Sequence, residues 1–188
     1  MNRDTRTALM DLAEHTVRSR GFDGFSYADL AEAIGIRKAS IHYHFPTKAS
    51  LSEALIERYQ TNLQHGLAEI EAANASAGER LEALIALYRG ALHDGRTVCL
   101  CVAFSTCRES LSDIVIARVG AVRAMVLQWI AETFELGQRD GSVSAIGDPS
   151  DEAPATLAML EGAHLAARTE EDPAVFDAAT RLLRARCQ

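Results

Sequence analysis

Apolar residues recur at intervals of three and four along most of the chain, which is the spacing of one face of an α-helix. The pattern predicts a first helix over residues 5–20, with Leu9, Leu12, Ala13 and Val17 buried. Glycine and proline, which most often interrupt helices, number only 12 and 4 in 188 residues. The spacing therefore predicts an all-α chain of about nine helices.

The strongest local signals lie in the first quarter of the chain. Ser26 and Asp29 have the spacing of a capping box, which predicts a helix that starts at Tyr27, directly after the Ser26 cap, and ends at Gly35. A short helix is expected over residues 38–44, and Pro46 cannot continue it. Helix, glycine turn and helix thus follow one another with the spacing of a helix-turn-helix.

The rest of the chain is also predicted to be helical. Residues 97–104 have strand propensity, but a lone strand would have no partner, so residues 101–110 are assigned to a helix. Residues 140–151 contain glycine, proline and serine and are expected to form a flexible loop. The other predicted helices run from Thr47 past Ile70, from Leu81 to Leu92, and over 113–136, 153–168 and 173–186.

Charge is distributed unevenly along the chain, whose net charge is −7. Residues 1–48 hold seven basic and six acidic side chains, whereas the remainder holds twelve basic and twenty acidic ones. Lys38 and Lys48, the two lysines of the sequence, both lie in this first segment. An arginine bias explains the scarcity of lysine but not its location, which favours an anionic partner for the N-terminal segment.

The short helix over residues 38–44 carries the candidate chemistry. Ile41 is expected to face the core, which leaves a face of hydrogen-bond donors for solvent or for base edges in a major groove. Periodicity alone also allows an ordinary solvated helix face. The outward residues are Arg37, Lys38, Ser40, Tyr43 and His44, with the small residue Ala39 beside them.

The stretch from Phe22 to Leu51 resembles the N-terminal DNA-binding domain of the TetR family of transcriptional repressors. The Ser26 cap, Gly35, the pair His44 and Phe45, and Lys48 fall at the family's spacing. The resemblance implies a helix-turn-helix domain over residues 1–48, the helix 48–73 as connector, and a ligand-binding and dimerisation domain over residues 74–188.

The resemblance also implies residue roles. Phosphate contacts are expected from Ser26, Tyr43, His44 and Lys48, and base contacts from Arg37, Lys38, Ala39 and Ser40. Where the family usually has tyrosine in the recognition helix, this chain has His42 followed by Tyr43, so a phosphate contact by His42 departs from the pattern. The implied partners are double-stranded operator DNA, a small-molecule or electrophilic effector and a second copy of the chain.

Three cysteines cluster in the C-terminal body: Cys99, Cys101 and Cys107. Their spacing fits no structural zinc site, so no metal or cofactor is expected. They are either small core residues or thiol sensors activated by Arg96 and Arg108. The second interpretation resembles the electrophile-responsive subgroup of the family.

The effector pocket is less defined by sequence. Candidate pocket residues are Tyr88, Phe104, Trp129 and His164, although each also fits an ordinary core position. The last two helices combine small and large apolar residues suited to a dimer bundle or to an internal core.

We therefore expect a dimeric repressor, not an enzyme, that acts in the cytoplasm without a membrane segment. The alternatives are a cysteine hydrolase using Cys101 and His93, which lacks an oxyanion loop, and a protein-binding module on the same fold.

Overall fold

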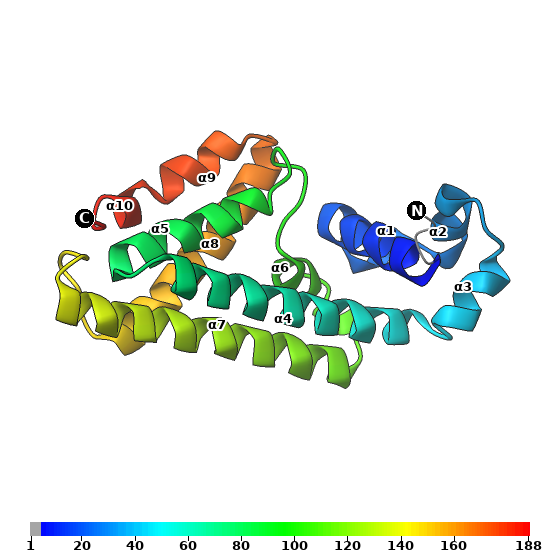
Figure 1. The fold of residues 1–188 in the computed structure, drawn as a ribbon. Coiled ribbons are helices and arrows are strands. Elements are labelled where there is room, and N and C mark those ends of the chain that lie inside the picture. The colour runs from blue at the N-terminus through cyan, green and yellow to red at the C-terminus, as the bar shows by residue number, and fades with distance from the viewer. Residues whose placement is uncertain (1–4) are drawn as a thin grey trace. The chain divides into compact units, whose positions relative to one another are not determined.

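A computed structural model describes residues 5–188, and this part of the chain is helical, with one isolated bridge between Val143 and Cys187. Figure 1 shows the succession of helices. The all-α prediction is confirmed, with ten α-helices and two short 3₁₀ helices in the described residues. They are α1 (Thr5–Arg20), η1 (Phe22–Gly24), α2 (Tyr27–Ile34), α3 (Lys38–His44), α4 (Lys48–Ala73), α5 (Ala77–Gly90), α6 (Leu100–Ser105), η2 (Arg108–Ser110), α7 (Asp113–Asp140), α8 (Pro149–Glu170), α9 (Pro173–Ala179) and α10 (Arg181–Arg184).

The chain forms two compact units, and the boundary between them cuts through α4 and α7. The first unit comprises Met1–Thr61 and Leu100–Ala121, and the second comprises Asn62–Cys99 and Val122–Gln188. Residues 1–4, including the charged Arg3 and Asp4 counted above, lie outside the described residues.

The first unit buries the helix faces that the sequence pattern predicts. Leu9, Ala13 and Val17 of α1 are buried, as is Ile41 of α3, whereas Leu12 is half-buried. Residues 100–104 of α6 belong to the same unit, and the Phe104 ring packs edge-on against Phe22 at a centroid distance of 6.2 Å. This unit therefore combines the N-terminal helices with a segment distant in sequence: Phe22 and Phe104 are 82 residues apart.

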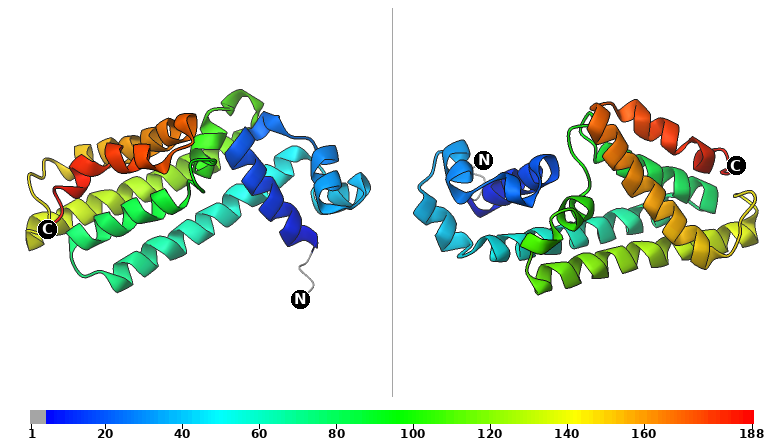
Figure 2. Two further views of the ribbon diagram at one scale, coloured as in Figure 1. Left: turned by 90° about the horizontal axis from the view of Figure 1, so that it is seen from above. Right: turned by 180° about the vertical axis from the view of Figure 1, so that it is seen from behind.

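The second unit has its own apolar core, formed by α5, α8, α9 and α10 with parts of α4 and α7. Figure 2 shows α5, α8 and α9 together, with the C-terminus just beyond α10. Its largest fully buried side chains include Phe134 and Phe176. The core explains why α7, although long and apolar enough by composition to cross a membrane, behaves as a core helix: Val126, Ile130 and Phe134 are buried in it.

Several helix boundaries differ from the sequence-based expectation. α5 runs over Ala77–Gly90, and α8 begins at Pro149, inside the segment that the sequence predicts as a flexible loop. The sixth helix ends at Ser105, where the Thr106 hydroxyl donates to Ala103 O, so Cys101 and Cys107 do not share one helix. The seventh extends to Asp140. The last predicted helix is broken at Thr180, whose hydroxyl donates at 2.9 Å to Phe176 O, a back-bond that bends helices.

Candidate DNA-binding interface and effector region

The α2–turn–α3 segment is built by local rules. The capping box predicted at Ser26 is present: Ser26 N donates to Asp29 Oδ2 at 2.6 Å, and Asp29 N donates to Ser26 Oγ at 3.4 Å. Hydrogen bonds from Ser26 lower the pKa of the Asp29 carboxyl. At the other end of α2, Gly35 has φ 76°, a left-handed conformation that glycine adopts without strain. This fixed turn sets the direction in which α3 leaves α2.

Side chains then hold α3 against the unit. Ile41 and Phe45 are 0% and 2% exposed, so one face of α3 is anchored in the core. The Tyr27 hydroxyl donates to Phe45 O at 3.1 Å and to Thr47 O at 2.5 Å, joining α2 to the end of α3. Burial raises the pKa of Tyr27 to about 12, so the hydroxyl keeps its proton at neutral pH.

The opposite face of α3 is open to solvent. Tyr43 is 84% exposed, the highest value among the large apolar side chains of the described residues. Arg37, Lys38, Ala39 and His42 are also exposed, whereas Ser40 and His44 are half-buried. The structure thus brings the candidate base-reading residues onto one accessible surface.

His42 is more constrained than its exposure suggests. Its Nδ1 lies 3.1 Å from Pro46 O, and because a carbonyl only accepts, Nδ1 carries the proton in this contact. Its ring also packs edge-on against Tyr27 at 5.0 Å. Only Nε2 remains for another partner.

The Lys48 side chain makes hydrogen bonds within the first unit. Its Nζ donates to Phe22 O at 2.5 Å and to Phe25 O at 2.7 Å, and lies over both phenylalanine rings. Burial lowers the pKa of the Lys48 ammonium, an effect opposed mainly by the negative charge of the Asp23 carboxylate. An ammonium has three N–H donors, so the two carbonyls leave one for a further acceptor.

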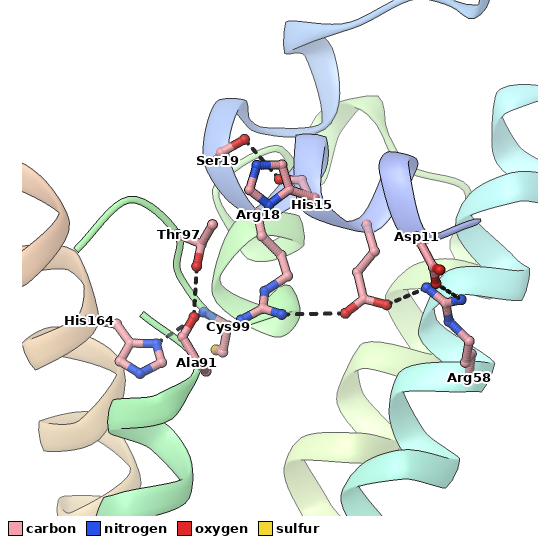
Figure 3. A network of polar contacts seen from close by, with 10 residues as sticks. Asp11, His15, Arg18, Ser19, Arg58, Ala91, Thr97, Cys99 and His164 are labelled. Carbon is pink, nitrogen blue, oxygen red and sulfur yellow. Dashed lines mark hydrogen bonds and ion pairs between the residues drawn. The ribbon is translucent and has the colours of Figure 1, made fainter. Parts of the chain in front are cut away.

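An ion-pair cluster joins α1 to α4 (Figure 3). Arg58 donates to Asp11 at 2.8 Å and to Glu14 at 2.7 Å. Sequence reasoning missed this cluster and the Tyr27 hydroxyl, because partners 18 to 47 residues apart leave no local pattern.

The candidate pocket residues are divided between the two units, and Tyr88 and Trp129 belong to the same core cluster of the second unit. In the second unit the Tyr88 and His164 rings are 5.5 Å apart. Cys99 N donates to His164 Nδ1 at 3.0 Å (Figure 3). The proton therefore lies on Nε2, which contacts Tyr88 O at 2.8 Å. Both nitrogens of this fully buried histidine therefore have partners. Phe104 is in the core of the first unit, and Trp129 lies between α4 and α7.

The cysteines also have different surroundings. Cys99 and Cys101 are 3% and 5% exposed, while Cys107 is half-buried in the turn after α6. The Cys107 Sγ lies 3.4 Å from the position that a Cβ would take at Gly21. His93, the partner of Cys101 in the hydrolase alternative, lies in an exposed turn with φ 44°.

An α-helical unit that presents an exposed, donor-rich second helix after a glycine turn defines a helix-turn-helix DNA-binding protein. Residues 9–55 match the sequence model of the bacterial regulatory proteins of the tetR family. The chain is 30% identical to a TetR-family transcriptional regulator from Agrobacterium tumefaciens, with a TM-score of 0.91 over 97% of both chains. The protein therefore belongs to the TetR family and is a transcriptional regulator.

Two further comparisons involve one repressor. The chain is 24% identical over 170 residues to the HTH-type transcriptional repressor NemR of Escherichia coli K12, covering 88% of this chain and 84% of that protein. The crystal structure of E. coli NemR in its reduced form has a TM-score of 0.81 at 22% identity, over 99% of this chain and 98% of that one. At 22% identity, the comparison with the reduced NemR structure supports the fold alone.

Proposed function

We propose that this regulator represses transcription in the cytoplasm by binding a palindromic operator as a dimer, with α3 in the major groove. The observation that carries the proposal is the exposed donor face of α3, fixed by Ile41, Phe45 and Tyr27 on its other side. Arg37 and Lys38 donate to guanine edges, Ala39 and Ser40 lie close to bases, and Ser26, Tyr43, His44 and Lys48 contact phosphates. A phosphate contact of His42 uses its Nε2.

The functions that we propose for the segments are those that the sequence predicts. Residues 1–48 bind DNA, α4 is the connector, and residues 74–188 carry the effector site and the dimer contact. A dimer reading two half-sites places its recognition helices about 34–36 Å apart, one turn of DNA.

Exposed apolar positions on the last helices support the dimer. Leu165 of α8 is 45% exposed and Leu182 of α10 is 80% exposed, although leucine side chains are usually buried. Small exposed residues surround Leu165 on the same face of α8 and allow close helix approach: Ala155, Ala158 and Gly162. We place the self-association surface on this face.

The proposed signal is a small molecule or a thiol-modifying electrophile or oxidant. Of the clustered cysteines, Cys107 is the accessible one, and its Sγ faces Gly21 in the turn between α1 and η1. Lys48 holds the next residue of that turn, Phe22, by its carbonyl. A group added to Sγ presses on this turn, so Cys107 is our first choice over Cys99 and Cys101.

The test is a gel shift with the DNA that flanks the gene, using the full chain and single-site variants. Arg37→Ala should relax preference at particular base pairs, at a cost of about 1–3 kcal/mol if the contact is bidentate. A uniform loss over all operator variants would place Arg37 on phosphate instead. No binding to any flanking DNA would refute the proposed repressor.

The same assay tests the signal. A quinone added to the wild type should release the DNA, and Cys107→Ser should resist release, with Cys187→Ser as a matched control outside the cluster. If Cys107→Ser is released like the wild type, the thiol is not the sensor.

A further inference from the structure

The side chain of His42 on α3 is held from two sides. Its Nδ1 donates to Pro46 O at 3.1 Å, and its ring packs edge-on against the Tyr27 ring at a centroid distance of 5.0 Å. The Tyr27 hydroxyl in turn donates to the carbonyls on either side of Pro46, those of Phe45 and Thr47. Three successive carbonyls of the α3–α4 connection therefore accept hydrogen bonds from side chains of α2 and α3.

The bond to Pro46 O fixes the tautomer of the neutral His42 ring. A neutral imidazole carries one proton, so a ring that donates from Nδ1 has only a lone pair on Nε2. A phosphate oxygen is also an acceptor, and two acceptors form no hydrogen bond. Neutral His42 therefore cannot donate to a phosphate while it keeps its bond to Pro46 O.

Moving the single proton to Nε2 gives no better arrangement. The lone pair of Nδ1 would then oppose the lone pairs of the Pro46 carbonyl at 3.1 Å. Imidazolium has an N–H on both nitrogens, so it keeps the bond to Pro46 O and donates from Nε2 at the same time. A hydrogen bond from a cation to a phosphate is also stronger than a neutral one. The charged ring is thus the form of His42 that suits a phosphate.

The protein itself provides no negative partner for a charged His42. Tyr27 packs on it from α2, and burial raises the pKa of Tyr27 to about 12, so this neighbour is neutral. Within residues 5–188, neither Asp29 nor Glu32 of α2 forms an ion pair with His42. Lys38 lies one turn earlier on the same side of α3, where its positive charge opposes protonation of the ring.

The helices next to α3 also bring positive rather than negative charge. Arg6 of α1 lies over the Phe45 ring at 5.1 Å, at the end of α3, and Lys48 opens α4. A duplex bound at the α3 surface brings phosphates, whose charge favours the imidazolium form. An imidazole titrates between about pH 5 and 8, so near neutral pH the phosphates decide whether His42 is charged.

We propose that His42 contacts an operator phosphate as imidazolium, so that each subunit takes up one proton from solvent at His42 Nε2 when it binds DNA. Operator affinity then rises as the pH falls through the neutral range. The inference rests on the proposed function, because it concerns the regulation of the same DNA-binding surface. It also gives a consequence to the departure from the family pattern: a tyrosine hydroxyl donates throughout this pH range, whereas the Nε2 of His42 donates only after protonation.

Two replacements of this exposed side chain bracket its charge. His42→Lys is positive and His42→Gln is neutral from about pH 6 to about pH 8. Affinity for the flanking DNA is measured by fluorescence anisotropy at constant salt. The wild type should approach His42→Lys at the lower pH and His42→Gln at the higher one, so its affinity should fall at least about fivefold more than that of either variant. An equal pH dependence in all three proteins would overturn the proposal.

Other titrating groups are controlled in the same series. His44 is present in the wild type and in both variants, so its contribution to the pH dependence cancels in the comparison. The matched control is His65→Gln, which removes an exposed histidine of α4 that lies in the second unit. Its pH dependence should equal that of the wild type. If His65→Gln flattens the curve as much as His42→Gln, the effect is one of general charge and the site is refuted.

Two further readouts would not respond to a merely structural role of His42. Calorimetric titration with the flanking DNA in two buffers of different ionisation enthalpy counts the protons taken up. The wild type should take up about 0.5–1 more proton per subunit than His42→Gln near neutral pH, and equal counts would overturn the proposal. Nitrogen NMR of the free protein with labelled histidine should show the proton of neutral His42 on Nδ1, and a proton on Nε2 would overturn it as well.

The failure of this inference differs from the failure of the proposed function. If the protein binds no flanking DNA at either pH, the proposed repressor is refuted. If it binds the DNA and His42→Gln leaves the pH dependence unchanged, the proposed repressor stands and the protonated contact of His42 is refuted.

Discussion

The substitution Lys48→Met removes an ammonium that the first unit uses as an internal hydrogen-bond donor. Nζ donates to Phe22 O at 2.5 Å and to Phe25 O at 2.7 Å, and lies 4.4 and 4.1 Å from the two ring centroids. Methionine keeps most of the apolar stem but has no donor. The two carbonyls, which flank η1 and the α2 cap, then lose their shared partner.

The expected loss follows from these contacts. A hydrogen bond to a charged group contributes about 1.5–3 kcal/mol, and an exposed cation–π contact about 0.5–1 kcal/mol. In the wild type, the Lys48 ammonium regains hydration when the chain unfolds. In the variant, the freed carbonyls can bind water, so the contributions of the individual contacts do not simply add. We expect the free energy of unfolding to fall by about 2–4 kcal/mol.

Two measurements separate the structural role from the DNA contact. Urea unfolding followed by circular dichroism gives the change in stability. Operator affinity over a series of salt concentrations gives the number of neutralised phosphates, and loss of one contact should lower the slope by about 0.9 per subunit.

Lys38→Met is the matched control, because it removes the other lysine from an exposed position of α3. It should leave the free energy of unfolding unchanged within about 0.5 kcal/mol and alter base preference. If Lys48→Met is as stable as the wild type, the internal donor role is wrong. If it is destabilised but the salt slope is unchanged, the phosphate contact is wrong.

Three other features give independent tests. Ala158→Arg, at an exposed position of α8, should produce monomers in sedimentation and abolish operator binding, and a monomeric wild type would contradict the dimer surface. Cys107 should be alkylated first by N-ethylmaleimide in mass spectrometry, because two of the other cysteines are buried and burial raises the pKa of Cys187 to about 11; earlier labelling of another thiol would contradict this order. The Arg186 hydrogen bond lowers the pKa of Glu152 from 4.5, so the pair stabilises the fold above that pH and the gain is lost as pH falls through the lower folded value. Glu152→Gln should therefore cost about 1 kcal/mol at pH 7 and progressively less as the pH falls below 4.5, and a cost that does not change with pH would contradict the assignment.

The sequence by itself determined the helix boundaries and the buried helix face of the α2–turn–α3 segment. The capping box at Ser26, the left-handed Gly35 and the end of α3 before Pro46 were predictable because each depends on residues within one helical turn. The buried Ile41 followed from the same periodicity. The family resemblance also rested on this segment, where the local rules are strictest.

Tertiary structure decided what those residues contact. The hydroxyl of Tyr27 reaches carbonyls 18 and 20 residues away, and Lys48 turns inward to carbonyls 23 and 26 residues away. The break at Thr180 coincides with a side-chain back-bond from this fully buried threonine rather than with a glycine or proline. Periodicity specifies which face of a helix is buried, but the partner that covers the face is set by packing of the whole chain.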